Sequence, residues 1–146
     1  MNGTKAVGII GLGLVGKAVA SRLLEAGYSI LGYDIDRTAM NQAGDLGVER
    51  AASAQDIVRQ CSLTLLSLPD SDIVNSVLWG EQGIGPGCPR GAVLLDTTTA
   101  RPKETVAHHN RLEEQGVRFI DAPLVGSSEE IGRGAVSYTH LTLPTN

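Results

Sequence analysis

The sequence predicts an α/β fold in which helices cover both faces of a doubly wound parallel sheet. Short apolar runs typical of buried strands alternate about six times with segments of helical hydrophobic spacing. Each return to a parallel strand needs a crossover connection, and the predicted helices supply these connections. Aromatic residues make up only 3% of the chain, so we expect a core built from Val, Leu, Ile and Ala.

The predicted strands are short apolar runs, several of which end at Gly, Pro or Asp. Most are continuous rather than alternating, which indicates burial on both faces of a parallel sheet. In chain order, the expected strands are Ala6–Ile10, Ser29–Tyr33, Val48–Arg50, Leu63–Leu68, Ala92–Leu95 and Val117–Ile120.

The predicted helices lie between these strands and are located by capping residues and hydrophobic spacing. Asp36, Ser53 and Asp70 are each expected to cap a helix amino terminus, and Pro102 suits a first helical turn. The region 80–91 holds five glycines and two prolines and is expected to be a loop. The first expected helix follows the glycine-rich loop and ends at Gly27. The later ones are expected from Asp36 through Met40 toward Gly44, from Ser53 through Gln60, from Asp70 through Leu78, and from Arg101 to about Gln115.

Charge and composition argue against several classes of partner. The formal net charge is −4 and no basic run occurs, which disfavours nucleic acid or an anionic membrane as the main partner. Apolar runs are too short to span a bilayer, and a strand follows the first few residues, so we expect no signal peptide. Cys61 and Cys88 are expected to be reduced thiols in a cytoplasmic protein.

A glycine-rich loop joins the first predicted strand to the first predicted helix. An acidic residue, Asp34, ends the next strand about 20 residues later, as in the Rossmann dinucleotide fingerprint. In that fingerprint the glycines allow a tight turn, close approach of the pyrophosphate and close helix packing. We therefore expect a nicotinamide dinucleotide to bind the loop, which reads Gly11-Leu12-Gly13-Leu14-Val15-Gly16.

The residues after the second strand bear on the choice between NAD and NADP. The Asp34 carboxylate can accept hydrogen bonds from the adenosine ribose, and it would repel a 2′-phosphate. Asp36 adds to that repulsion, whereas Arg37 could pair with the phosphate or with either carboxylate. The nearer charges are negative, so we expect NAD, with NADP as the alternative.

Polar residues also follow the later predicted strands, where open α/β sheets bind ligands. Leu68-Pro69 ends the fourth strand, Thr97–Thr99 follows the fifth, and Asp121 begins the segment after the sixth. The threonines could hydrogen-bond a nicotinamide carboxamide or a substrate, or they could cap the following helix.

Four motifs in order, GLGLVG, LSLPDS, DTTTARP and DAPLVGSS, resemble the β-hydroxyacid dehydrogenases from Ala6 to about Gly134. That family includes 3-hydroxyisobutyrate dehydrogenase, tartronate semialdehyde reductase and the NADP-binding domain of 6-phosphogluconate dehydrogenase. The resemblance implies that Leu68 and Pro69 line the cofactor and that Thr99 contacts its nicotinamide side. It also implies that the DAP-x-x-G stretch helps to hold a substrate carboxylate, through Val125, Gly126 and Ser127.

This chain departs from the family pattern in the substrate motif. Family members usually read DAPVSGG, so Val125 stands where a serine is expected and Ser127 where a glycine is expected. Ser127 or Ser128 could take over the carboxylate contact, or the substrate could differ from the small 3-hydroxy acids that the family usually oxidises.

The resemblance also implies a catalytic lysine beyond the DAP motif and a second lysine motif in an all-helical carboxyl-terminal domain. Lys5, Lys17 and Lys103 match neither motif, so we expect no catalytic residue in this chain. Residues 1–135 are expected to be an NAD(P)-binding domain truncated before the helical domain, through which family members typically pair.

Residues 136–146 bear no relation to the sequence before them. Their first ten residues, VSYTHLTLPT, resemble a translated read-through of a transposon-derived sequencing adapter. The alternative is a genuine polar carboxyl-terminal strand. We interpret the segment as non-native and leave it out of functional reasoning.

Adjacent histidines, His108 and His109, are the remaining candidates for chemistry. Neighbouring residues on a helix point in different directions and cannot readily share a metal, so we expect solvated side chains and no metal site.

The predicted function is that of the cofactor domain of an oxidoreductase. The parent enzyme would transfer a hydride between NAD(P) and a small 3-hydroxy acid or its semialdehyde, of the 3-hydroxyisobutyrate or tartronate semialdehyde type. The fragment alone should bind dinucleotide weakly and turn over nothing. The alternatives are a non-catalytic NAD-binding or sensing module, and a family reductase for an imine or a phosphorylated sugar acid.

Overall fold

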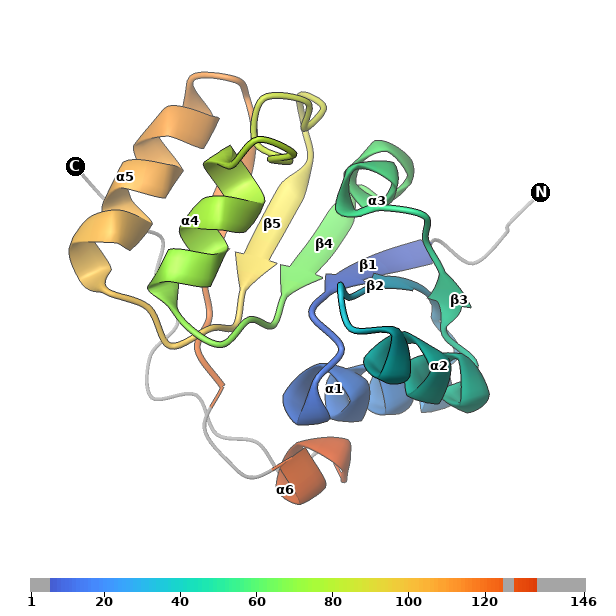
Figure 1. The fold of residues 1–146 in the computed structure, drawn as a ribbon. Coiled ribbons are helices and arrows are strands. Elements are labelled where there is room, and N and C mark those ends of the chain that lie inside the picture. Colours follow the sequence, from blue (N-terminus) through green and yellow to red (C-terminus); the bar gives the residue numbers. More distant parts are fainter. Residues whose placement is uncertain (1–5, 125–127, 134–146) are drawn as a thin grey trace.

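The computed structural model describes residues 6–124 and 128–133 and has the doubly wound parallel sheet that the sequence predicts (Figure 1). Over these residues the sheet contains six parallel strands in the order β3-β2-β1-β4-β5-β6. The strands are β1 (Ala6–Ile10), β2 (Ser29–Tyr33), β3 (Glu49–Arg50), β4 (Leu63–Leu66), β5 (Val93–Asp96) and β6 (Arg118–Asp121). The helices are α1 (Leu14–Glu25), α2 (Arg37–Leu46), α3 (Ala54–Gln60), α4 (Ser71–Trp79), α5 (Pro102–Glu113) and α6 (Ser128–Gly132).

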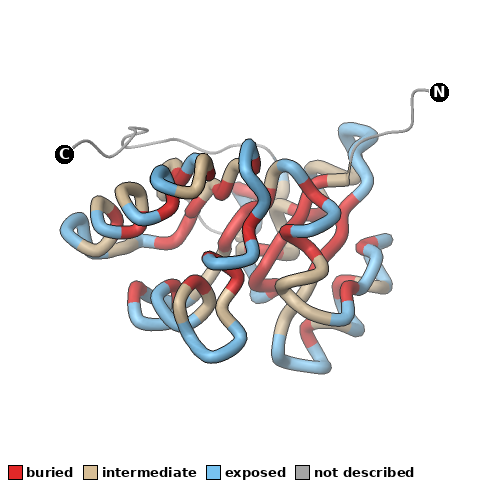
Figure 2. Tube along the Cα trace, turned by 90° about the horizontal axis from the view of Figure 1, so that it is seen from above, coloured by how far each residue is buried: buried red, intermediate tan, exposed pale blue. Residues whose placement is uncertain are grey.

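Helices cover both faces of the sheet, and each face has its own apolar core. Figure 1 shows α3, α4 and α5 on one face, with α1 and α2 on the other and α6 beside α1. The strands other than the short edge strand β3 form a largely buried band between the helical layers, as the burial colours of Figure 2 show. Phe119, Leu94 and Leu66 centre the core under α3, α4 and α5, whereas Ile9 and Ala20 belong to the core under α1 and α2.

The order of the strands reverses at β1, which lies between β2 and β4. The register sets Ile10 opposite both Tyr33 and Leu66, so the ends of these three strands are level. The chain segments that leave them therefore meet at one point on the carboxyl edge of the sheet. In doubly wound sheets this is the point at which ligands bind.

The predicted caps are confirmed, and they explain where the shorter helices begin. The Asp36 carboxylate accepts from Thr38 N–H at 2.9 Å, Ser53 Oγ accepts from Asp56 N–H at 3.1 Å, and Asp70 accepts from the N–H of the residue Ile73 at 3.0 Å. No helix among the described residues is long and apolar enough to cross a membrane.

Some predicted boundaries were wrong. Helix α2 continues through Gly44 and ends before Gly47, because Gly47 (φ 109°) adopts the left-handed conformation that closes a helix. Strand β4 ends at Leu66, two residues before the predicted limit, because Leu68 N–H bonds a side chain instead of a neighbouring strand. The short helix α6 was not predicted.

The expectation that His108 is solvated was also wrong. Its side chain is 6% exposed and packs edge-on against Phe119, with ring centroids 5.7 Å apart. Trp79 Nε1–H donates to His108 Nδ1 at 3.0 Å, which joins α4 to α5, and the Arg111 guanidinium stacks over the Trp79 ring. Adjacent His109 is half-buried rather than fully solvated, so the two histidines occupy different environments.

We predict that His108 makes the protein less stable in acid. Burial lowers the pKa of His108 from its ordinary value of 6.5. Just below that pH, His108 is therefore protonated in the unfolded chain and remains neutral in the folded chain. The free energy of unfolding should therefore fall as the pH drops below about 6.5. Glutamine in His108→Gln can still accept a hydrogen bond from Trp79 but does not titrate. The free energy of unfolding of this variant, measured by urea at a series of pH values around 6.5, should therefore depend less on pH. An equal slope in both proteins would contradict the prediction.

Candidate dinucleotide-binding site

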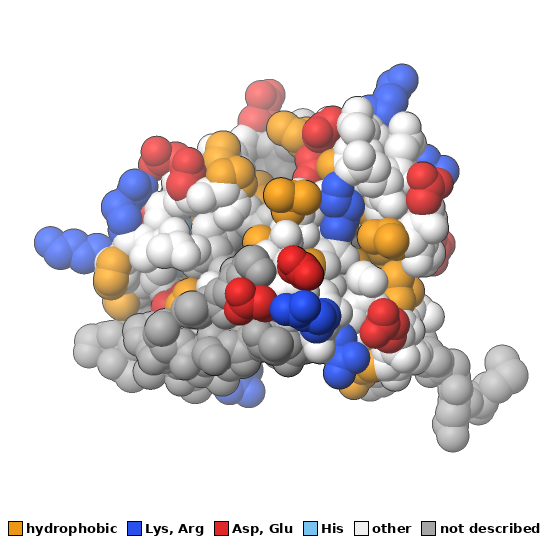
Figure 3. Space-filling model, turned by 90° about the horizontal axis from the view of Figure 1, so that it is seen from below, with side chains coloured by type: hydrophobic (Ala, Val, Ile, Leu, Met, Phe, Trp, Pro, Cys, Tyr) orange, Lys and Arg blue, Asp and Glu red, His pale blue; other side chains and the backbone are white. Residues whose placement is uncertain are grey.

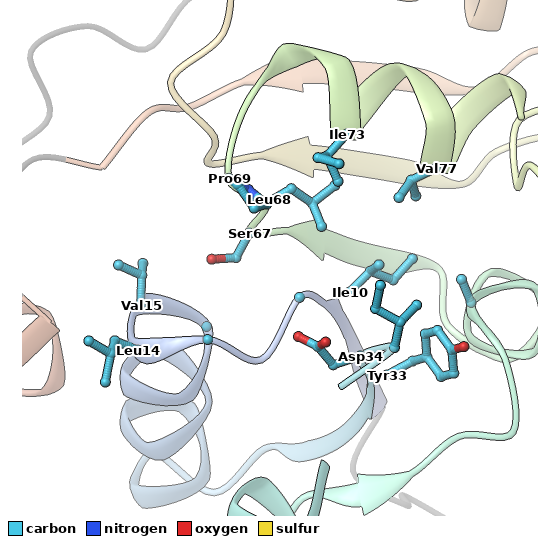
Figure 4. A pocket seen from close by; sticks show the side chains of 15 residues that line it. Ile10, Leu14, Val15, Tyr33, Asp34, Ser67, Leu68, Pro69, Ile73 and Val77 are labelled. Carbon is cyan, nitrogen blue, oxygen red and sulfur yellow. The ribbon is translucent and has the colours of Figure 1, made fainter. Parts of the chain in front are cut away.

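A pocket of about 530 Å³ lies on the carboxyl edge of the sheet, where β1 separates β2 from β4. Its volume is within the range of ordinary small-molecule sites. Figure 4 shows Leu68, Ile73 and Val77 along one wall, with Asp34 and Tyr33 opposite. The lining residues are Ile10, Gly11, Gly13, Leu14, Val15, Gly16, Tyr33, Asp34, Ile35, Ala54, Ser67, Leu68, Pro69, Ile73 and Val77.

Two glycines of the loop are required by close contacts inside the protein. A Cβ on Gly11, whose φ is 101°, would lie 2.0 Å from the carbonyl oxygen of Ser67. A Cβ on Gly16 would lie 2.0 Å from the carbonyl oxygen of Gly11. Real Cβ atoms do not approach an oxygen this closely, so β1, α1 and the end of β4 can pack together only with glycine at both positions.

Gly13 differs because its Cβ position is open. Nothing lies within 4 Å of it, and its φ of −70° is accessible to any residue. The fold therefore does not need glycine here. Space kept clear beside a helix amino terminus is what a pyrophosphate would occupy, so the residues fit the group that the sequence predicts.

The first turn of α1 supplies donors to this space. Lys17 N–H makes the first helical bond, to the carbonyl of Gly13 at 2.9 Å, so the N–H groups of Leu14, Val15 and Gly16 have no partner within the helix. No side chain caps the helix and its first turn contains no acidic residue. The positive end of the helix dipole thus faces the pocket with no charge from the helix's own first turn to offset it.

Asp34 is held rigidly at the end of β2. Its Oδ2 accepts from Leu12 N–H at 2.7 Å and its Oδ1 accepts from Asp36 N–H at 2.8 Å. Each oxygen retains a lone pair for a further donor, such as a ribose hydroxyl. Leu12 itself does not line the pocket, because its side chain is fully buried in the core and its N–H is bonded to Asp34.

The opposite wall comes from the segment after β4. Ser67, Leu68 and Pro69 line the pocket. The cofactor contact that the family resemblance implies for Leu68 and Pro69 remains a prediction. Sequence reasoning assigned Ile73 and Val77 of α4 only to a helix, whereas both side chains also face the pocket (Figure 4). Their spacing of i, i+4 beside the buried residues of α4 widens its apolar face, which is the signal that could have revealed them.

The three threonines after β5 have different roles. Thr97 Oγ1 donates to the Leu66 carbonyl at 2.8 Å, and Thr98 Oγ1 accepts from Leu68 N–H at 3.1 Å. Both threonines are buried and tie the loop after β5 to the loop after β4. Thr99 is exposed beside them and does not line the pocket. Its expected contact with a nicotinamide remains a prediction.

The predicted substrate residues Val125, Gly126 and Ser127 lie outside the described residues, as do residues 136–146. Within the described part of the chain, the pocket lining contains no lysine, histidine or cysteine, and no cluster of metal-ligating side chains occurs. Figure 3 shows the face seen from below, with hydrophobic side chains between charged groups of both signs.

Asp96 is a buried carboxyl group beneath this edge of the sheet. Its side chain is 0% exposed, and Oδ1 accepts from Thr98 N–H at 2.9 Å. Among the described residues, Oδ2 has no hydrogen-bond partner. Burial raises the pKa of Asp96 from 3.8 to about 6, opposed by the Thr98 hydrogen bonds and assisted by the Asp121 charge on the paired strand β6.

The sheet order and the pocket together define a Rossmann-type dinucleotide-binding domain. The family described as the NAD binding domain of 6-phosphogluconate dehydrogenase matches residues 6–139. The chain belongs to this family.

The curated relatives include dehydrogenases and a reductase. The chain is 27% identical over 131 residues to 2-(hydroxymethyl)glutarate dehydrogenase of Eubacterium barkeri, which covers 90% of the chain and 44% of that protein. It is 30% identical over 136 residues to mitochondrial 3-hydroxyisobutyrate dehydrogenase of Rattus norvegicus. This match covers 93% of the chain and 39% of that protein. The chain thus spans about two fifths of the length of these curated relatives.

A solved structure supports the fold. The 3-hydroxyisobutyrate dehydrogenase of Mycobacterium tuberculosis, determined with L-serine, superposes with a TM-score of 0.84 at 21% identity. The match covers 93% of this chain and 46% of that one.

We predict that Asp96 makes stability fall as the pH rises. Its pKa is higher in the folded chain, so the folded state holds the extra proton between about pH 4 and pH 6. The free energy of unfolding should drop by up to about 3 kcal/mol through this window. Asp96→Asn should remove that component, measured as the difference between the two urea-unfolding profiles. A difference that does not vary with pH would contradict the assignment.

Proposed function

We propose that this chain binds NAD in the pocket as the cofactor domain of an oxidoreductase acting on a small 3-hydroxy acid or its semialdehyde. The observation that carries the proposal is the space kept open over Gly13, between the first turn of α1 and the fixed carboxylate of Asp34. The substrate class is supported by the names of the two dehydrogenases above, since both specify acids with a hydroxymethyl group beside the carboxylate.

Each part of the dinucleotide has a matching part of the pocket. Pyrophosphate would accept from the free N–H groups at the start of α1, and the adenosine ribose would donate to Asp34. The adenine would lie in the apolar section lined by Ile35, Ile73 and Val77. Leu68 and Pro69 would support the nicotinamide half, with Thr99 nearby on the next loop.

The chemistry requires one more component. When bound, the cofactor supplies the hydride acceptor or donor, and an acid–base group must lie within hydrogen-bond reach of the substrate hydroxyl. The described pocket lining contains no lysine or histidine for this task. We therefore propose that the acid–base group lies outside the described residues, and that this chain by itself binds dinucleotide without turnover.

Electrostatics favour NAD over NADP. Two backbone N–H groups hold the Asp34 carboxylate at the pocket, where it would repel a 2′-phosphate. The Asp36 carboxylate is nearby and caps α2. Arg37 is exposed in the first turn of the same helix and is the residue that could favour the phosphate. Its charge is offset by the carboxylates of Asp34 and Asp36, which precede it in the same short segment.

We predict that Gly13→Ala weakens binding of NADH at least about tenfold, because the new methyl group fills the space meant for the phosphates. Its stability should change by about 1 kcal/mol or less, the usual effect of Ala at a helix N-cap. Gly87→Ala is the matched control, since a Cβ there also meets nothing within 4 Å and the residue does not line the pocket. NADH fluorescence titration and urea unfolding provide the two measurements. Equal affinity in all three proteins would refute the placement of the pyrophosphate.

We predict that the chain binds NADH more tightly than NADPH and that Asp34→Asn reduces this preference by about tenfold, or 1.4 kcal/mol. The physical reason is the loss of the charge that repels the 2′-phosphate. Asp36→Asn is the control, because Asn caps a helix as well as Asp does. The preference should fall less in that variant than in Asp34→Asn, because Asp36 adds to the repulsion but does not line the pocket. Tighter binding of NADPH by the unmodified chain would overturn the choice of cofactor.

A further inference from the structure

Asp96 does not touch the pocket, yet two hydrogen bonds connect it to the pocket wall. Its Oδ1 accepts from Thr98 N–H at 2.9 Å, and Thr98 Oγ1 in turn accepts from Leu68 N–H at 3.1 Å. Leu68 lines the pocket. The chain of contacts therefore runs from a buried carboxyl group at the end of β5, through one residue of the next loop, to the wall formed after β4.

The Leu68 amide has left the sheet at this point. Strand β4 ends at Leu66, and Ser67 N–H still bonds to the carbonyl of Ile10 at 2.9 Å. At Leu68, the backbone N–H is held by a side chain of another loop rather than by a neighbouring strand. A partly buried N–H without an acceptor is unfavourable, so the Thr98 hydroxyl determines where this part of the wall lies.

Asp96 occupies an unfavourable place for a carboxyl group. It is fully buried, has an oxygen without a hydrogen-bond partner among the described residues, and lies opposite Asp121 in the paired strand. Burial of this kind costs free energy. The hydrogen bond from Thr98 N–H offsets part of this cost and also fixes the position of Thr98. Among the described residues, no other side chain accepts from this N–H.

We propose that Asp96 is a positioning residue for dinucleotide binding: through Thr98 it sets the position of the Leu68 wall. This inference rests on the proposed function, because it assigns a new residue to that same pocket. The residue acts at a distance through two hydrogen bonds and does not contact the ligand.

The test compares variants that break the connection at different points. Asp96→Leu removes the acceptor for Thr98 N–H, and Thr98→Val removes the acceptor for Leu68 N–H; each should weaken NADH binding roughly threefold to tenfold. The double variant should bind NADH within about twofold of the single variant that has the lower affinity, because both changes break the same connection. Asp96→Asn and Thr98→Ser retain the acceptors and should recover most of the affinity.

Thr105→Val is the control for general loss of a buried hydroxyl. Thr105 is buried in α5 and its hydroxyl bonds to the carbonyl of Arg101 at 3.3 Å, away from Leu68. It should cost some stability and leave NADH affinity unchanged. If Thr105→Val weakens binding as much as Thr98→Val does, the effect is a general loss of stability and the positioning role is wrong.

Hydrogen exchange at the Leu68 amide, followed by NMR without ligand, gives an independent measurement. Exchange should accelerate at least about tenfold in Asp96→Leu and Thr98→Val and return toward normal in the two conservative variants. Unchanged exchange in Asp96→Leu overturns the inference. If the unmodified chain does not bind NADH, the proposed function fails, and the exchange data still decide whether Asp96 controls the Leu68 backbone.

Discussion

The close approach of β1, α1 and the end of β4 is the constraint on which the rest of the site depends. Gly11 and Gly16 allow this approach because they have no Cβ atom. A Cβ at either position would lie 2.0 Å from a carbonyl oxygen. Because the helix can start this close to the strand, the residues that carry its free N–H groups line the pocket at the carboxyl edge of the sheet. A larger residue at either position would push α1 away and separate the donors from the opposite wall.

Asp34 shows how the same loop is fixed from the other side. Its carboxylate accepts from Leu12 N–H, so the end of β2 is bonded to the loop that follows β1. The negative charge needed for ribose recognition is thus also a structural tie. This double role explains why the carboxylate is held in place before any ligand arrives, and why Asn is a better test than Ala, since Asn keeps one acceptor oxygen.

The sequence was sufficient for features that depend on local chemistry. Glycine spacing located the loop, and side-chain caps at Asp36, Ser53 and Asp70 located three helix starts, because each acts on residues within one turn. Features that depend on packing were less accessible. The burial of His108 arises from Trp79 and Phe119, which are distant in sequence, and no local pattern distinguishes it from an exposed histidine on a polar helix.

The site divides in the same way. Gly13, Asp34 and Leu68 follow from the fingerprint and the strand ends, whereas the wall formed by Ile73 and Val77 depends on how α4 is rotated against the sheet. Rotation of a helix is set by its core contacts, here through Val74 and the side chains of the neighbouring strands. Periodicity shows that such a face exists but does not show how far around the helix the pocket extends.

Buried polar groups gather at the carboxyl edge because the chain must leave the sheet there. Each segment that departs from a strand loses ladder partners for its N–H and C=O groups, and buried groups need replacements. Thr97, Thr98 and Ser71 supply them, binding Leu66, Leu68 and Arg101 backbone groups respectively. The same hydrogen bonds that satisfy the backbone also join adjacent loops into one rigid rim. The hydrogen bonds that satisfy the buried backbone groups at this edge therefore also hold the walls of a ligand site there in place.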